Sequence, residues 1–425
     1  MTFLNTRIPL LEDEIGVPVA ARDATDWRLA AGARSSKFVT QMVNPVEIPR
    51  DFRLDLYRGI ALWLIFLGHV PGNILNRITP WDYGFSDPAE IFIFVSGYAN
   101  AYVYGRVMEQ RGFVVSAAQI LRRAFETYVA QMFLFVIFIA EVALLSHGSH
   151  AFDDAMNIRF FRDDPVQSIL AVTLLKFMPV NMDVLPLYIV VLAASPVMLW
   201  LLRRVPVVAL LLSGAIYAIA NLTGLDLPSY PKGHWYFDPL AWQFLFVLGA
   251  WCGLGAADWL WRLVRSRTVV ITAAVYAVAV FAAFIALKQL EAGDLVPQWL
   301  QHAFGKTYLG VLRLLHFVAI AIVVNHLIPR EWPPLSSWVL RPAIQCGQHS
   351  LEVFCLGVTL AFAGHVAILG VSGNPLVRML VNIGGILAMI AVSALITWYK
   401  STRVSFRVTV PADENISPSP TPPKS

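Results

Sequence analysis

The sequence predicts an all-α polytopic membrane protein with about ten transmembrane helices and one short interfacial or re-entrant helix. Of its 425 residues, 57% are hydrophobic and only 14% are charged, which leaves too little polar surface for a soluble protein of this length. The apolar residues fall into runs of about 20 residues, the length that spans a bilayer. Basic residues lie at the ends of these runs, so they are interpreted as orientation signals and anion contacts rather than a nucleic-acid surface.

Ten apolar runs are long enough to cross the membrane. In order along the chain, they cover residues 58–76, 87–106, 124–145, 183–202, 205–222, 238–256, 268–288, 309–328, 346–370 and 375–398. A further apolar segment, 166–178, is too short to span a bilayer. It is expected to be an interfacial or re-entrant helix, or the beginning of a broken fourth helix.

The segments outside these runs divide the chain into three parts. Residues 1–49 form an N-terminal extension that lacks a basic start followed by an apolar run, so no cleavable signal peptide is expected. Residues 50–400 form the transmembrane domain, and residues 401–425 form a largely disordered tail that ends in a region rich in proline and serine. The three cysteines lie inside apolar segments, which argues against disulfides and a zinc site, and no metal site is predicted.

Loop charges predict that both termini are cytoplasmic. Basic residues are concentrated in the loops and tail on the N-terminal side: Arg106, Arg111, Arg122, Arg123, Arg203, Arg204, Arg262, Arg265, Arg267, Arg330, Arg341, Lys400, Arg403 and Arg407. The opposite loops contain fewer: Arg77, Arg159, Arg162, Lys232, Lys288 and Lys306. Cytoplasmic loops carry the excess of lysine and arginine, so the N-terminal side is predicted to face the cytoplasm.

The predicted outer loops are unusually aromatic. Residues 223–242 are dense in tryptophan, tyrosine, phenylalanine and proline and include Trp235, and residues 292–308 add Trp299, Lys306 and Tyr308. Aromatic faces with polar neighbours suit stacking on sugar rings. An ordinary interfacial aromatic belt would give the same composition, so both interpretations stay open.

The first predicted helix carries the most informative pair of residues. Arg58 lies at its cytoplasmic mouth and His69 lies farther along the same helix, roughly 16 Å away at a rise of ~1.5 Å per residue. An ionisable residue inside a membrane helix is a functional candidate, and histidine titrates near neutrality, which suits a general base. The alternative is a histidine that only hydrogen-bonds across helices.

Two carboxylates open the second predicted helix. Asp87 is suited to capping the helix N-terminus, and Glu90 is placed to orient an imidazole, as a carboxylate does in triad-like sites. Ser96 and Gly97 follow in the same helix and permit close helix packing, although Ser96 is also a candidate for the pocket. The predicted catalytic residues are therefore His69, Glu90 and Asp87.

Several segments together resemble a known family. The Arg58–His69 arrangement looks like the motif of the acyltransferase-3 superfamily of membrane acyltransferases, and more closely the chain resembles its OpgC family. The matching segments are RLDLYRGIALWLIFLGHVPGN, GFSDPAEIFIFVSGY, MDVLPLY, WYFDPLAWQFLFVLGA, GKTYLGVLRLLHFVA and CGQHSLEVFCLG. They extend over nearly the whole membrane domain, and the N-terminal extension has no recognised counterpart.

The resemblance implies a multi-pass protein of the bacterial inner membrane that succinylates osmoregulated periplasmic glucans. Succinyl-CoA would be a cytoplasmic co-substrate, with no permanently bound cofactor, and a periplasmic glucan would be the acceptor. His69 would be the catalytic histidine and Arg58 a donor contact, with Arg122 and Arg123 as a further basic pair. Arginines suit the phosphates of coenzyme A, although the pair would also serve orientation alone.

Other polar residues are expected near the same site. A general base at His69 would take the proton of a sugar hydroxyl that attacks the thioester, and an acyl-histidine intermediate is the alternative. Arg313 or Lys306 is the expected partner of a succinyl carboxylate, and His349 and Glu352 are expected to share a helix face. The candidate acceptor or acyl pocket comprises Ser96, Asp183, Trp235, Lys306, Tyr308, Arg313, His316, His349 and Glu352.

Other functions remain open at this stage. A saccharide transporter or flippase would also use buried charges and aromatic outer loops, and acetyl transfer to another cell-envelope glycan would keep the chemistry. The lipid bilayer is an expected partner and nucleic acid is not. The sequence leaves open the donor acyl group, the glucan linkage, an acyl-enzyme, a homo-oligomer and partners in glucan synthesis.

Overall fold

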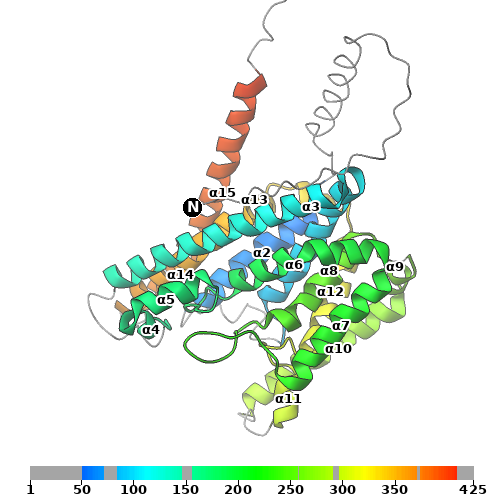
Figure 1. The fold of residues 1–425 in the computed structure, drawn as a ribbon, viewed down its shortest axis with the longest axis horizontal. Coiled ribbons are helices and arrows are strands. Elements are labelled where there is room, and N and C mark those ends of the chain that lie inside the picture. Colours follow the sequence, from blue (N-terminus) through cyan, green and yellow to red (C-terminus); the bar gives the residue numbers. More distant parts are fainter. Residues whose placement is uncertain are drawn as a thin grey trace, which may run out of the picture. The chain divides into compact units, whose positions relative to one another are not determined.

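The computed structural model describes residues 50–70, 84–145, 156–256, 258–290, 296–370 and 374–408, and every regular element within them is a helix (Figure 1). The N-terminal extension and residues 409–425 lie outside these ranges. Six of the described helices are long and apolar enough to cross a membrane, and Pro239–Gly253 and Val311–Leu327 are shorter apolar helices. The predicted all-α membrane fold is confirmed, whereas the count of ten crossings remains a prediction.

Helices α2 (Phe52–His69) and α3 (Pro88–Leu145) depart from their predicted bounds. Helix α2 starts before the predicted residue 58 because the Asp51 carboxylate accepts a hydrogen bond from the backbone N–H of Arg53, which caps the helix there. It ends at His69, so the histidine closes the helix instead of lying within it. The predicted helices 87–106 and 124–145 form one helical run, interrupted at Gly112, whose φ is 83°.

Helix α3 packs directly on α6 (Val184–Arg204) and α8 (Pro239–Gly253). A Cβ atom at Gly97 would collide with the carbonyl oxygen of Phe246, and one at Gly249 would collide with that of Phe94. The backbones of α3 and α8 therefore approach as closely as small residues allow. This agrees with the close packing predicted at Gly97.

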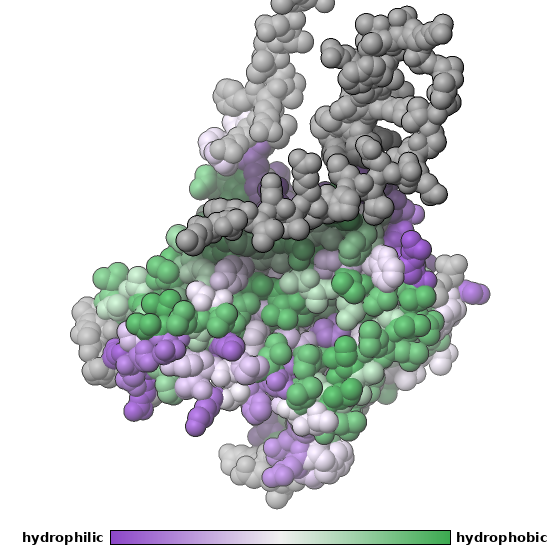
Figure 2. All heavy atoms as spheres, viewed as in Figure 1, coloured by the Kyte–Doolittle hydropathy of each residue, from purple (hydrophilic) through white to green (hydrophobic). Residues whose placement is uncertain are grey.

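Helices α7 (Pro206–Thr223), α10 (Arg267–Gln289) and α12 (Val311–Leu327) complete the region beside α8. Helix α7 packs on α8 and α10 packs on α12. The outward faces of α7 and α10 are apolar, with exposed side chains at Leu211 and Val278, and Figure 2 shows broad hydrophobic areas on the visible face. Lipid accounts for such a surface, since a soluble monomer rarely exposes so much contiguous apolar area.

The C-terminal helices pack on α2. The predicted helix 346–370 is two helices, α13 (Arg341–Gln348) and α14 (Ser350–Gly370), because the chain turns at His349. Helix α15 (Pro375–Val408) continues beyond the predicted start of the tail.

Most of helix α5 (Pro165–Thr173) lies in the short predicted segment 166–178, directly after helix α4 (Arg159–Asp163). The remaining short elements lie in the connections between the long helices. They are α4 (Arg159–Asp163), α5 (Pro165–Thr173), α9 (Asp258–Val264), α11 (Gln298–Ala303) and the 3-10 helix η5 (Pro333–Ser336).

Candidate active site

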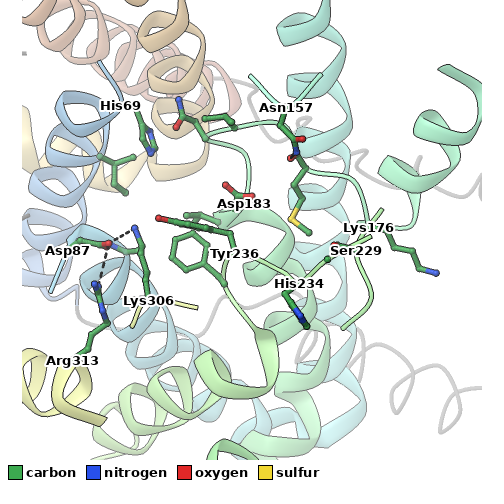
Figure 3. Close-up of a pocket in the computed structure, with 18 of the residues that line it drawn as sticks. His69, Asp87, Asn157, Lys176, Asp183, Ser229, His234, Tyr236, Lys306 and Arg313 are labelled. Atoms are coloured by element: carbon green, nitrogen blue, oxygen red, sulfur yellow. Dashed lines mark hydrogen bonds and ion pairs between the residues drawn. The ribbon is translucent and has the colours of Figure 1, made fainter. Parts of the chain in front are cut away.

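A cavity of about 1240 Å³ lies at the end of the helices where α2 finishes. It is larger than the ~300–1,000 Å³ of typical small-molecule pockets. Its walls come from the end of α2, the starts of α3, α6 and α12, and the loop before α8. The cavity contains five of the predicted site residues: His69, Asp87, Asp183, Lys306 and Arg313. Figure 3 shows His69, Asp183, Tyr236 and Lys306 around the same space.

The start of α3 is held by a reciprocal capping arrangement. The backbone N–H of Asp87 donates to Glu90 Oε2 at 2.7 Å, and the backbone N–H of Ala89 donates to Asp87 Oδ1 at 2.7 Å. Pro88 occupies the first helical position, where a missing N–H costs nothing. This is the capping-box pattern. It fixes both carboxylates at the start of α3 and leaves one oxygen of each for another partner.

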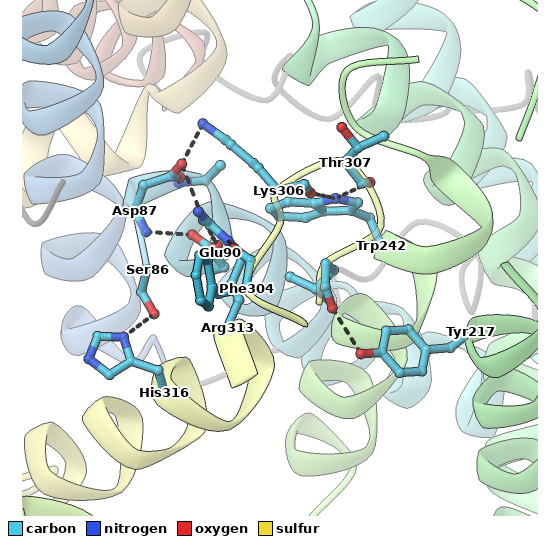
Figure 4. A network of polar contacts seen from close by, with 12 residues as sticks. Ser86, Asp87, Glu90, Tyr217, Trp242, Phe304, Lys306, Thr307, Arg313 and His316 are labelled. Atoms are coloured by element: carbon cyan, nitrogen blue, oxygen red, sulfur yellow. Dashed lines mark hydrogen bonds and ion pairs between the residues drawn. The ribbon is translucent and has the colours of Figure 1, made fainter. Parts of the chain in front are cut away.

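Those remaining oxygens bind two cations from distant parts of the chain. Arg313 Nη1 lies 2.6 Å from Glu90 Oε1 and 3.7 Å from Asp87 Oδ2. Lys306 Nζ pairs with Asp87 Oδ2. Glu90 is fully buried and Asp87 nearly so, so the two acids and two bases form a charge-balanced network (Figure 4). A buried charge without such a partner would be costly.

Two aromatic side chains hold the loop that carries Lys306 through hydrogen bonds to its backbone. Trp242 Nε1 donates to the carbonyl oxygen of Lys306 at 3.0 Å, and the Tyr217 hydroxyl donates to the carbonyl oxygen of Leu309 at 2.8 Å (Figure 4). The Lys306 ammonium lies 4.9 Å from the centre of the Phe237 ring and 5.2 Å from that of Tyr236. Such cation–π contacts hold a lysine over aromatic faces, so the ammonium is positioned at the cavity wall.

His69 lies in the last turn of α2 and lines the same cavity as Asp87 and Lys306. Glu90, predicted to orient the imidazole, has one oxygen on Arg313 and the other on the Asp87 backbone. Glu90 is therefore bound to other groups and is not among the residues that line the cavity with His69, whereas Asp87 is.

The ionisation of the wall residues outside the membrane helices follows from their neighbours. Burial alone would raise the pKa of Asp87, but Lys306 and Arg313 outweigh it and hold that pKa below its ordinary value. Burial opposes the charge on Lys306, yet Asp87 keeps its pKa above the ordinary value. Burial raises the pKa of Asp183 to about 7, with Lys306 opposing. The cavity thus contains a fixed ion pair beside a carboxyl group that titrates near neutrality.

The aromatic loop before α8 lines the cavity with residues 229–234, Tyr236 and Phe237. His234 and Tyr236 line it, whereas the predicted Trp235 is buried in the loop and donates its backbone N–H to Asp226 at 2.8 Å. Asp238 caps α8 by accepting from the N–H groups of Leu240 and Ala241. Trp235, which the sequence analysis placed in the pocket, is therefore not among the residues that line this cavity, whereas Tyr236 is.

A second, smaller cavity of about 160 Å³ lies farther along helices α2, α3 and α6. Arg58, Arg123, Ser96 and Tyr188 line it. The Arg58 Nε atom is buried and has no hydrogen-bond partner among the described residues. Arg122, predicted to act with Arg123, does not line this cavity, and both arginines pair with Glu126, Arg122 at 3.1 Å and Arg123 at 3.4 Å. The structure therefore brings Arg58 together with Arg123 and not with Arg122.

Helices α2, α3 and α6 contribute residues to both cavities, and we refer to the interface between these three helices as the seam. Ala89 and Val184 line the large cavity, and Phe92 and Leu185 line the small one. Phe92 is one turn of α3 away from Ala89, a separation of about 4.5 Å along the helix axis. The Phe92 and Tyr188 rings meet edge to face with centroids 5.9 Å apart. Both rings line the small cavity together with Arg58 and Arg123.

The other predicted pocket residues have structural partners elsewhere. His316 Nδ1 lies 2.8 Å from Ser86 Oγ, and the Tyr308 hydroxyl donates to the carbonyl oxygen of Gly224 at 3.1 Å. His349 Nε2 lies 2.9 Å from Thr397 Oγ1, and Glu352 is exposed. His349 lies between α13 and α14, so it and Glu352 do not share one helix as predicted. Within the described ranges, no group of three or more His, Cys, Asp or Glu residues could hold a metal ion.

Comparison with known proteins gives one match. The sequence model of a protein family described as "OpgC protein" matches residues 50–401, which include every residue of both cavities. No curated protein and no solved structure matches the chain.

Proposed function

The chain belongs to the OpgC family, and on that premise we propose that it is a membrane O-acyltransferase. In this proposal it transfers a succinyl group from cytoplasmic succinyl-CoA to a hydroxyl group of a periplasmic glucan. It would lie in the bacterial inner membrane with both termini cytoplasmic, and both substrates would bind transiently.

The observation that carries the proposal is the placement of the two cavities on one seam. Arg58 and Arg123 line the small cavity, and His69 ends the same helix at the large cavity. Arg58 and His69 are roughly 16 Å apart along α2. An anionic donor held at the arginines could extend a long, thin arm toward His69, while a polar acceptor enters from the opposite end.

The donor side has the chemistry for a phosphate-bearing ligand. Arginine binds phosphate through charge-assisted and often bidentate hydrogen bonds. A buried polar atom without a partner calls for an explanation, and the Nε atom of Arg58 is such an atom among the described residues. A ligand that accepts a hydrogen bond from Arg58 would supply that partner.

The acceptor side has the groups that acyl transfer requires. In the proposed step, His69 takes the proton from a sugar hydroxyl as its oxygen attacks the thioester carbonyl carbon. The carbon–sulfur bond then breaks, and the proton passes to the leaving thiolate, giving an ester and free coenzyme A. A positioned base contributes ~10²–10⁴ in rate. Lys306 is the proposed partner of the succinyl carboxylate, because its ammonium lies at the cavity wall over the Tyr236 and Phe237 rings; it would then be shared between that carboxylate and Asp87.

Mass spectrometry of periplasmic glucans tests this proposal. Cells would carry wild-type protein, His69→Ala, His365→Ala or no copy, with the amount of protein in the membrane measured by immunoblot. His365 lies in α14 and is not among the cavity residues, so its variant controls for the loss of a membrane histidine. Succinyl increments should be present with wild type and His365→Ala and absent from the other two strains.

Other outcomes would change the assignment in defined ways. Acetyl increments with the same strain pattern would keep the mechanism and replace the donor. Unmodified glucans in all four strains would remove the glucan as acceptor. Full modification by an inserted His69→Ala protein would remove His69 from the catalytic role.

A further inference from the structure

A third cavity, of about 850 Å³, lies at the opposite end of the helices from His69. It is formed by the start of α2, one face of α3, the ends of α6, α8 and α12, and helix α9. We refer to it as the basic cavity because five arginines line it. They are Arg53, Arg106, Arg203, Arg265 and Arg330.

The described carboxylates leave the basic cavity with an excess of positive charge. Asp51 is shared by Arg53 at 2.9 Å and Arg330 at 3.3 Å. Glu109 lies 3.4 Å from Arg203, which also donates to the carbonyl oxygen of Gly105 at 2.8 Å. Two carboxylates therefore serve three of the five guanidinium groups.

The other two arginines have no carboxylate partner among the described residues. The Arg106 guanidinium lies 4.4 Å from the centre of the Tyr102 ring, a contact that leaves its N–H donors available. Arg265 is exposed at the end of α9. A half-enclosed space with unneutralised guanidinium groups attracts anions strongly, because the lower effective dielectric strengthens each contact. Guanidinium geometry favours phosphate in particular.

The basic cavity is distinct from the small cavity that we propose as the donor site. Tyr98, Tyr102 and Arg106 line it from one face of α3, at the helical spacing of side chains that share a face. Ser96 and Asn100 line the Arg58 cavity from another face of the same helix. Helix α3 therefore separates the two sites, and a ligand in the basic cavity would not lie in the seam that leads to His69.

We infer that the basic cavity binds a phosphate ester through Arg106 and Arg265, supported by the paired arginines around them. Two sources would present this group at a membrane face: the headgroup of an anionic phospholipid and the phosphates of a nucleotide. Tyr98, Tyr102 and Trp261 supply aromatic surface beside the charges. The inference concerns phosphate binding alone and stands whether or not the protein transfers an acyl group.

Binding to full-length protein in nanodiscs tests the inference and separates the sources. One arm titrates adenosine 3′,5′-bisphosphate by calorimetry in phosphatidylcholine nanodiscs. The other measures, by native mass spectrometry, the phosphatidylglycerol retained by protein from mixed-lipid nanodiscs. Arg106→Gln/Arg265→Gln removes the two charges without touching the pairs on Asp51 and Glu109. Arg204→Gln/Arg262→Gln removes the same charge from nearby arginines that do not line the cavity.

Saturable binding in either arm, weakened about tenfold or more in the first double variant and little changed in the second, is expected for two charge-assisted contacts. Binding in the bisphosphate arm alone identifies a nucleotide, and binding in the lipid arm alone identifies a headgroup. No binding in either arm, or binding that both double variants weaken equally or leave unchanged, would overturn the inference. If the first double variant does not fold, Arg265→Gln alone should still weaken binding, because this side chain is exposed; an unchanged affinity would then refute the inference.

Discussion

Removing Arg313 should destabilise the protein strongly, and a second substitution at its partner should restore part of the loss. Arg313 Nη1 lies 2.6 Å from Glu90 Oε1, and the side chains are 12% and 0% exposed. At an effective dielectric of about 20, two unit charges at this separation attract by ~6 kcal/mol, and desolvation offsets part of that. Arg313→Met leaves Glu90 charged and buried without its cation, which should cost about 3–5 kcal/mol.

The double variant Arg313→Met/Glu90→Gln removes the unpaired charge as well. The amide oxygen can still accept from the Asp87 backbone N–H that Glu90 Oε2 accepts from now. The double variant should therefore be more stable than Arg313→Met alone, by about 1–3 kcal/mol. Equilibrium unfolding in mixed micelles of wild type, both single variants and the double variant gives the coupling energy. Additive losses within ~0.5 kcal/mol would refute the buried ion pair.

Three further predictions follow from the packing and the site. Gly97→Leu should impair folding and reduce the amount of inserted protein, because its Cβ would collide with the carbonyl oxygen of Phe246. An immunoblot of membranes measures that amount. Gly384→Leu is the matched control, because a Cβ at that position meets nothing within 4 Å. Burial raises the pKa of Asp183 to about 7, above its ordinary value of 3.8, so its contribution to stability should decrease between about pH 4 and 7 and then level off. Asp183→Asn should remove that slope from unfolding curves recorded across this range, and an unchanged slope would argue against a buried carboxyl. Arg58→Gln should raise the acyl-CoA concentration needed for half-maximal activity about tenfold or more, whereas Arg122→Gln, at an exposed position, should leave it nearly unchanged in a membrane-vesicle assay.

Much of the site could be predicted because ionisable residues are rare in membrane helices and stand out from their apolar surroundings. His69 and Arg313 were chosen on that ground, whereas Asp87, Asp183 and Lys306 were chosen as charged residues at the ends of predicted helices, and the fold gathers all five around one cavity. The same signal also selected His316 and His349, which instead bond to Ser86 and Thr397. A polar residue in an apolar run indicates that some partner exists, but it does not indicate which one.

Composition and the length of the apolar runs are enough to predict an all-α membrane protein. In lipid the backbone must satisfy its hydrogen bonds within each segment, so apolar runs of sufficient length become helices whatever their neighbours are. Tertiary structure decided the helix ends, as at His69 and at the turn between α13 and α14. It also decided the pairing of Glu90 with Arg313, 223 residues apart in the chain. The physical reason is that helix formation depends on local composition, whereas charge pairing and cavity walls depend on how distant helices pack.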